Sequence, residues 1–378
     1  MDLSVIVIVV VLTALIFDFT NGFHDTANAM ATSIATGALR PKVAVAVAGV
    51  LNLVGAFLSV EVAKTISSGL VNEARITPVV IFAGLVGAIL WNLFTWLLGL
   101  PSSSSHALFG GLIGATLVAA GASAVNFGTV VTKVVLPAIL SPLLAGVIAL
   151  IATYLAYRIT KRGEERTVTK GFKLGQIVSA SMVALAHGTN DAQKTMGIIT
   201  LTLITAGVLA PNSGPPFWVI LASGLAIALG TYLGGWRIIQ TLGKRVSDIQ
   251  TPQGFAAESA SAAVILTSSH LGFALSTTQV ATGSIFGAGA GRRLASVQWG
   301  VAGQMAIAWL LTLPAAAAVG AVAAWLASTG TVGTIIVAVV ALAVGLGIYA
   351  ISRRKPVTAD NVNDVPTPGE KVPAGTAS

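Results

Sequence analysis

Within long apolar stretches, the sequence reads Phe19-Thr20-Asn21-Gly22-Phe23-His24-Asp25-Thr26-Ala27-Asn28-Ala29 and, in its second half, His187-Gly188-Thr189-Asn190-Asp191-Ala192-Gln193-Lys194. Both segments contain the pattern Gly-x-x-Asp, which places an aspartate inside apolar sequence. A carboxylate at the centre of a bilayer costs about 2.5–3.5 kcal/mol even on insertion scales, so such a residue usually has a function.

The glycines of these segments suggest how the aspartates are positioned. Gly22 and Gly188 tolerate a break in the backbone, so we expect an interrupted helix at each of them. Asp25 and Asp191 would then lie near the start of a half-helix, whose free N–H groups favour an anion or an Asp cap. Simple capping is therefore the alternative interpretation of each aspartate.

The composition is that of a membrane protein. Of the 378 residues, 55% are hydrophobic and 9% are charged, whereas soluble domains carry about 25% charged residues. Mean hydropathy is +0.88. Apolar runs close to the ~20 residues that cross a hydrocarbon core of ~30 Å recur at 79–100, 134–157, 217–235 and 301–326. The sequence predicts an all-α polytopic membrane protein. The first apolar run, 3–17, lacks the features of a signal peptide, and we expect it to remain in the protein.

The basic residues indicate topology. The net charge is +8, but Lys and Arg are scattered through short loops, which fits the positive-inside rule and not nucleic-acid binding. Placing these loops in the cytoplasm of a plasma-membrane protein puts the N-terminus outside and the C-terminus inside. The predicted organisation is a first transmembrane repeat at 1–157, a basic cytoplasmic loop at 158–173, a second repeat with a terminal helix at 174–352, and a disordered tail at 353–378.

Two runs of hydroxyl side chains occupy corresponding places in the two halves: Gly99-Leu100-Pro101-Ser102-Ser103-Ser104-Ser105-His106 and Gly272-Phe273-Ala274-Leu275-Ser276-Thr277-Thr278-Gln279. Each run interrupts an apolar helix, and the topology requires each to return to its own side, so we expect two re-entrant hairpins lining protein or a water-filled cavity. By loop charge, the first half begins outside and the second inside. The repeats are then inverted, as is typical of secondary transporters with a site at the repeat interface.

The paired motifs predict a site for a tetrahedral oxyanion such as phosphate, because hydroxyl and amide groups supply several weak donors that also allow release. For one run alone, helix capping or bonding to the i−4 carbonyl would be the simpler interpretation. The pairing of two runs with two Asp motifs favours binding. The candidate binding residues are Asp25, Asn28, Ser103, Ser104, Ser105, Asn190, Asp191, Lys194, Ser276, Thr277 and Thr278.

Charge balance predicts co-transport. Two carboxylates beside an anion cannot both remain ionised without protons, sodium ions or a divalent metal bound to the anion. The candidates for coupling are Asp25, Asp191 and Glu258, the last of which lies in an apolar helix. Lys194 either pairs with Asp191 at i, i+3 or contacts the anion, and we favour the ion pair. Asp18 is a candidate to line the same cavity.

Together these motifs resemble the inorganic phosphate transporter (PiT) family, and in particular its bacterial low-affinity phosphate permeases. The resemblance extends over roughly residues 5–350. It implies an inverted-repeat carrier, commonly a homodimer, in which the Asp motifs and hydroxyl hairpins surround phosphate. Two features depart from the family pattern. Gln279 stands where the family usually has a histidine, and Gln193-Lys194 resembles bacterial members that are proton-coupled and accept metal–phosphate complexes.

The sequence therefore predicts secondary active phosphate symport, with protons favoured over sodium as the coupling ion. A sodium-coupled phosphate carrier and a carrier of another oxyanion, such as sulfate, are the alternatives. We find no G-x-x-x-x-G-K-[ST] segment for ATP-driven transport. We also find neither a nucleophile–base pair nor a metal cluster for a membrane enzyme acting on phosphorylated lipid, and so expect no enzyme and no cofactor. A passive channel would show no accumulation against a gradient.

Overall fold

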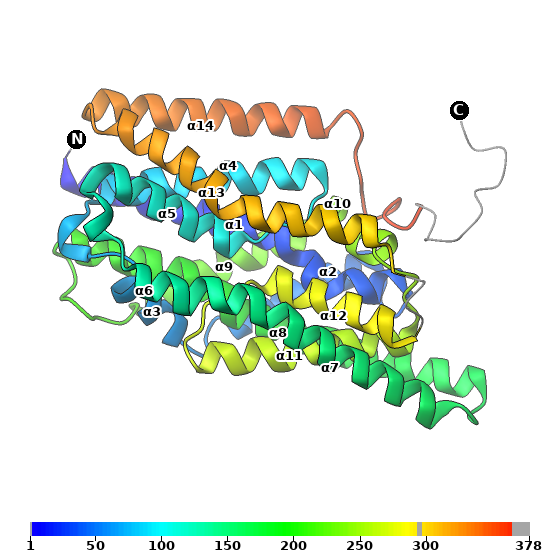
Figure 1. Ribbon diagram of the computed structural model, residues 1–378. Helices are drawn as coiled ribbons and strands as arrows, with labels where there is room; N and C mark the ends of the chain where they lie inside the picture. Colours follow the sequence, from blue (N-terminus) through cyan, green and yellow to red (C-terminus); the bar gives the residue numbers. More distant parts are fainter. Residues whose placement is uncertain (1, 293–296, 365–378) are drawn as a thin grey trace.

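The computed structural model describes residues 2–292 and 297–364, which form a bundle of helices (Figure 1). The α-helices are α1 (Leu3–Ala35), α2 (Pro41–Gly55), α3 (Glu61–Gly69), α4 (Pro78–Leu98), α5 (Ser104–Ala120), α6 (Phe127–Val130), α7 (Leu136–Thr160), α8 (Glu165–Thr205), α9 (Phe217–Leu233), α10 (Trp236–Gln240), α11 (Thr251–His270), α12 (Thr277–Arg292), α13 (Trp299–Ala327) and α14 (Thr331–Ser352). Short 3₁₀ turns at Glu73–Arg75 and Ala122–Ala124 and π-helical turns at Val131–Val135 and Thr241–Arg245 connect some of them.

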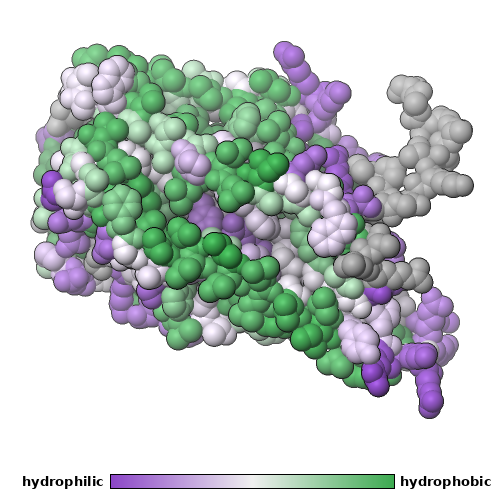
Figure 2. All heavy atoms as spheres, viewed as in Figure 1, coloured by the Kyte–Doolittle hydropathy of each residue, from purple (hydrophilic) through white to green (hydrophobic). Residues whose placement is uncertain are grey.

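The bundle has the surface of a membrane protein. Within the described residues, five helices are long and apolar enough to cross a membrane, and a sixth span arises if α9 and Trp236–Arg245, bent by 60°, are taken together. Figure 2 shows hydrophobic side chains across the middle of the molecule and hydrophilic ones towards its two ends. Leu143 and Leu310, on two of the apolar helices, are 62% and 77% exposed, and lipid is the natural neighbour of such side chains. The prediction of an all-α polytopic membrane protein is confirmed.

The connections at the bundle ends differ from the predicted domain boundaries. Helix α7 ends at Thr160 and α8 begins at Glu165, so residues 165–173 of the expected loop are helical. The N-terminus and the α7–α8 connection lie at opposite ends of the bundle (Figure 1). The start of the expected tail is attached to the bundle, because the Arg237 guanidinium donates to the Lys355 carbonyl at 2.5 Å. Residues 365–378 of that tail lie outside the described residues.

Both hydroxyl runs interrupt helices as predicted. Helix α4 ends at a left-handed Gly99 (φ 66°), and α5 begins after Ser103, whose side chain accepts from the His106 N–H. Helix α11 is likewise followed by a left-handed Gly272 (φ 70°), and α12 starts at Thr277. The two helices of each pair pack against each other as a hairpin. Their re-entrant path through a bilayer stays a prediction.

The expected helix breaks at the glycines are wrong. Helices α1 and α8 are continuous from Leu3 to Ala35 and from Glu165 to Thr205. Gly22 and Gly188 serve close packing instead: a Cβ on Gly22 would collide with the backbone of α9, and a Cβ on Gly188 with the backbone of Asn52 in α2. A helical glycine can permit a kink or bring another helix near, and here the second use applies. Asp25 and Asp191 are consequently mid-helix residues and do not cap the helices that carry them.

Each half of the chain packs against the other. Helix α1 contacts α9 and α8 contacts α2, while α5 contacts α13 and α12 contacts α7. Helices α1 and α8 run antiparallel, because Asn21 bonds to Asp191 whereas Thr36, farther along α1, bonds to Gln176, farther back in α8. An inverted repeat requires this direction of its two first helices. The inverted relation of the two complete halves stays a prediction.

Candidate substrate and coupling site

The two motif aspartates meet at the centre of the bundle. Asp25 of α1 and Asp191 of α8 are both fully buried. The Thr277 hydroxyl, in the first turn of α12, lies 3.5 Å from Asp25 Oδ2 and 3.2 Å from Asp191 Oδ2. A hydroxyl has a single proton to donate, so it can satisfy only one carboxylate at a time. The structure thus places both carboxylates around one shared donor.

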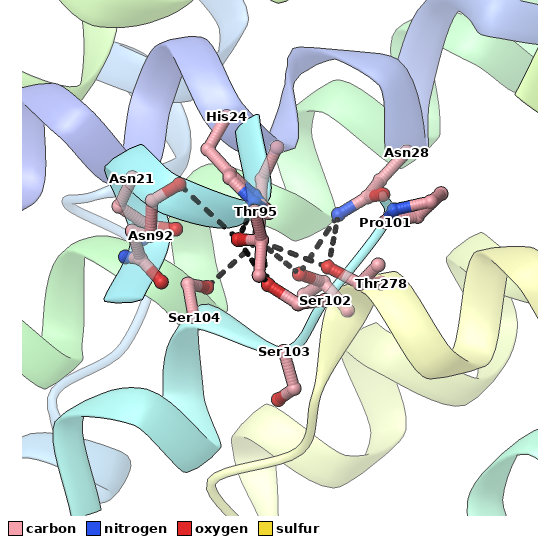
Figure 3. Close-up of polar contacts among 12 residues, drawn as sticks. Asn21, His24, Asn28, Asn92, Thr95, Pro101, Ser102, Ser103, Ser104 and Thr278 are labelled. Atoms are coloured by element: carbon pink, nitrogen blue, oxygen red, sulfur yellow. Dashed lines mark hydrogen bonds and ion pairs between the residues drawn. The ribbon is translucent and has the colours of Figure 1, made fainter. Parts of the chain in front are cut away.

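Asp25 receives donors from both hairpins. Ser104 Oγ donates to Asp25 Oδ2 at 2.8 Å, and Thr278 Oγ1 donates to the same oxygen at 3.2 Å. His24 Nδ1 lies 2.5 Å from Asp25 Oδ1. Asn28 Nδ2 donates to the Thr278 hydroxyl at 3.1 Å. In Figure 3, Asn28, Ser104 and Thr278 come from three different segments and point towards one place. The site therefore depends on the packing of α1 against α5 and α12.

Asp191 is the counterion of a buried lysine. Lys194 Nζ donates to Asp191 Oδ1, and the Lys194 side chain is fully buried. Asp191 Oδ2 accepts from Asn21 Nδ2 at 3.3 Å and lies 3.1 Å from His187 Nε2. The i, i+3 ion pair predicted from sequence is thus present. Further donors from Asn21 and Thr277 reach the Asp191 carboxylate, which offsets part of the cost of burying the pair.

The centre also has the geometry of a cation site. One ligand atom each from Asp25, His187 and Asp191 lies within 4.8 Å of the others. Carboxylate oxygens and an imidazole nitrogen can hold a divalent transition metal or zinc. Sequence analysis found no such cluster because His187 comes from α8 and Asp25 from α1, and only tertiary packing brings them together.

Four predicted binding residues have contacts of a different kind. Ser103 and Ser276 accept from the backbone N–H groups of His106 and Gln279, as the capping interpretation requires. The Ser105 hydroxyl donates to the Leu275 carbonyl at 3.1 Å, which ties the two hairpins together. Asn190 Nδ2 donates to Ser269 Oγ at 2.9 Å. Within the described residues, none of the four side chains hydrogen-bonds to either aspartate, and their substrate role stays a prediction.

Glu258 of α11 forms a second polar centre. Thr32 Oγ1 and Ser33 Oγ donate to Glu258 Oε1 at 2.5 and 2.6 Å. From α8, Ser179 Oγ donates to Oε2 at 2.7 Å and Gln176 Nε2 to Oε1 at 3.3 Å. The carboxyl group is therefore buried and fully hydrogen-bonded. Thr32 is about two helical turns from Asp25 along α1, so the two centres lie on one helix, about 10 Å apart along its axis.

Sequence analysis missed several of these partners. Asn21 contacts Asp191, and its position one turn before Asp25 in the same motif could have identified it. The hydroxyl and amide partners of Glu258 come from two other helices, and no local pattern connects them to Glu258. Gln193 belongs to the second Asp motif, and its side-chain oxygen Oε1 accepts from the Val62 N–H at 2.8 Å, at the start of α3. This contact orients a helix and does not reach the aspartates.

Comparison with known proteins agrees with the motifs. Residues 21–320 match the family described as "Phosphate transporter family". The chain is 56% identical over 361 residues to a "Probable low-affinity inorganic phosphate transporter" of Mycobacterium bovis, covering 95% of this chain and 87% of the relative. It is 44% identical over 323 residues to a protein of the same description from Bacillus subtilis, covering 85% and 97%.

A solved structure is also similar. "The sodium-dependent phosphate transporter" superimposes with a TM-score of 0.78 at 26% identity, covering 86% of this chain and 99% of the other. The family match spans well over half of the chain, and the relatives align over most of their length. The chain therefore belongs to the phosphate transporter family and is a membrane transporter, not an enzyme.

Proposed function

We propose that this chain is a secondary active carrier that moves inorganic phosphate across the plasma membrane together with a cation, with the proton as the favoured coupling ion. The observation that carries the proposal is the Thr277 hydroxyl between two buried carboxylates, Asp25 and Asp191. Donors that converge there can bind the carboxylates or an oxyanion, but not both at once. Phosphate binding and neutralisation of the carboxylates are therefore linked.

The charges of the site set the requirement for a cation. Lys194 balances Asp191, which leaves Asp25 as the carboxylate without a lysine partner. Phosphate adds at least one further negative charge. Neutralising the combined charge of Asp25 and phosphate in a buried site requires a proton or a metal ion. Protonation of Asp25 would weaken its hold on the hydroxyls of Ser104 and Thr278 and free them to donate to phosphate. Weak neutral donors also permit release, which a carrier requires.

The choice among cations is part of the proposal. Lys194 already places a positive charge beside Asp191, where a sodium-coupled carrier could hold its ion, and this favours protons. A solved relative is described as sodium-dependent, so sodium coupling is the alternative. The Asp25–His187–Asp191 cluster supports a third form, in which phosphate enters as a complex with a divalent metal. In that form the metal is cargo.

We further propose the arrangement in the membrane. The basic residues of the α7–α8 connection lie at the end of the bundle opposite the N-terminus (Figure 1). By the positive-inside rule, this supports a topology with the N-terminus outside and the C-terminus in the cytoplasm. We expect a homodimer, as the resemblance to the family implies.

The test is phosphate uptake into proteoliposomes with a proton or a sodium gradient imposed separately. Asp25→Asn and Asp191→Asn are measured beside the parent, with the exposed Asp2→Asn as control. We expect one gradient to drive accumulation, and both core variants to lose it while the control keeps it. Unlabelled sulfate and arsenate, added as competitors, identify the preferred oxyanion. Uptake that ignores both gradients, or that survives both core substitutions, would refute the coupling mechanism.

A further inference from the structure

A third carboxylate lies near this centre without a conventional partner. Asp18 of α1 has a relative exposure of 0%. Within residues 2–292 and 297–364, neither of its carboxylate oxygens makes a hydrogen bond of acceptable geometry. The Thr195 hydroxyl is the polar group beside it, and this hydroxyl also lacks such a bond. Buried polar groups in native proteins almost always have a partner, so two adjacent exceptions require an explanation.

The position of Asp18 relates it to the transport site. Asp18 is about two helical turns before Asp25 on α1, and Thr195 is about one turn after Asp191 on α8. Because α1 and α8 run antiparallel, these two displacements point in the same direction, towards the end of the bundle that holds the N-terminus. The charged groups that act on Asp18 are Lys194 and Asp191, both of α8. Asp18 therefore lies between that end of the bundle and the two central carboxylates.

The surroundings of Asp18 decide which cation it can hold. An ionised carboxylate in such a place, without a hydrogen bond or a paired cation, would cost several kcal/mol. Lys194 Nζ is bonded to Asp191, so it does not neutralise Asp18 in this state. A metal ion needs several oxygen ligands, whereas the polar group beside Asp18 among the described residues is one threonine hydroxyl, that of Thr195. A proton needs one acceptor, and the Thr195 oxygen can accept a hydrogen bond from a carboxylic acid.

We propose that Asp18 is a proton-binding residue of the carrier and that it shares Lys194 with Asp191. In the state described, Asp18 is a neutral acid and Lys194 pairs with Asp191. When a cation or a proton reaches Asp191, Lys194 is released from it and pairs with Asp18 instead, and Asp18 gives up its proton. The net charge of Asp18, Lys194 and Asp191 together is zero before Asp191 is neutralised and again after the proton has left. Asp18 thereby passes one proton per cycle.

This inference rests on the proposed function, and it predicts a separation between exchange and accumulation. Exchange of labelled for unlabelled phosphate at equal pH needs the binding site but no net proton movement. Accumulation driven by a pH gradient needs both. Asp18→Asn resembles the protonated acid in shape and charge, so the variant should fold, bind and exchange phosphate. It cannot release a proton.

The experiment uses the full chain in proteoliposomes, with a pH-sensitive dye inside to report proton entry. We expect Asp18→Asn to keep exchange within about twofold of the parent and to lose gradient-driven accumulation and proton entry by at least about tenfold. Asp2→Asn makes the same chemical change at the exposed start of α1 and should leave all three readouts unchanged. Thr195→Val removes the partner hydroxyl and should lower accumulation more than exchange.

Several outcomes would overturn the proposal. If Asp18→Asn moves as many protons per phosphate as the parent, Asp18 carries none. If the variant shows a normal thermal transition but no exchange, Asp18 belongs to the binding site and not to the proton path. If Asp18→Asn does not fold, Thr195→Val decides, and parental accumulation in that variant rejects the proposal. Failure of the parent itself to exchange phosphate would be a failure of the proposed function, and is seen before any variant is compared.

Discussion

Replacing Lys194 with methionine tests the electrostatics of the site most directly. The substitution leaves Asp191 fully buried with Asn21, Thr277 and His187 as its remaining neighbours. Removing one member of a buried ion pair costs about 3–5 kcal/mol, because the other charge is left uncompensated. With an unfolding entropy of about 2.1 cal/mol/K per residue over the 378 residues, this corresponds to a lowering of the midpoint of roughly 4–6 °C. Thermal unfolding of the purified protein in detergent measures it.

Three further measurements test whether the uncompensated Asp191 charge causes this loss of stability. Lys64 forms the same i, i+3 pair with Glu61, but both side chains are about half exposed, so Lys64→Met should change the midpoint by no more than about 1 °C. The double variant Asp191→Asn with Lys194→Met removes both charges and should recover most of the lost stability. Lowering the pH should reduce the effect of Lys194→Met, because protonation of Asp191 then removes the uncompensated buried charge. Equal midpoints for the Lys194 and Lys64 variants would refute the reasoning.

Three other substitutions have matched controls in the same chain. Thr277→Val removes the donor between the two carboxylates and should raise the KM for phosphate uptake by about 10- to 100-fold, whereas Thr202→Val, which loses only a bond to its own helix, should not. A KM equal to the parent's would contradict the bridging role. Glu258→Gln keeps the shape of the group but removes its charge. We expect lower gradient-driven accumulation with exchange retained, and no change for the exposed Glu165→Gln. Loss of exchange as well would place Glu258 in binding. Gly188→Ala inserts a methyl into the backbone of α2 and should lower the unfolding midpoint by the equivalent of about 1–3 kcal/mol. In the same helix, Gly171 has open space around it, so Gly171→Ala should raise the midpoint, and midpoints that move together would argue against the packing contact.

The features that the sequence could predict are those with a local pattern. The apolar runs and the scattered charges were sufficient for the membrane fold. Pro101 with its neighbouring glycine and serines marked a helix interruption, because that combination cannot continue a helix. The Lys194–Asp191 pair followed from i, i+3 spacing on one helix. In each of these cases, the residues that determine the feature are close together in the chain.

The features that could not be predicted from the sequence depend on tertiary packing. Gly22 can serve equally well as a break or as a contact surface, and the presence of α9 against it decides which use applies. The hydroxyl donors of Glu258 come from α1 and α8, and the serines of one short run have different partners although their neighbours are alike. Ser104 contacts Asp25, whereas Ser103 caps its helix. The direction in which each side chain points is set by where the helix begins, which the sequence leaves uncertain by a residue or two.

The packing of each half against the other has a consequence for synthesis of the protein. Gly110 and Gly114 of α5 are covered by the backbone of α13, which is made much later than α5. Gly283 and Gly287 of α12 are covered by the backbone of α7, which is already present when α12 is made. The hairpin of α4 and α5 is therefore synthesised before α13, the helix that covers it. The hairpin of α11 and α12 is synthesised after α7, which covers it. Until the ribosome has delivered α13, the nascent chain exposes a strip of small residues to lipid or to insertion factors.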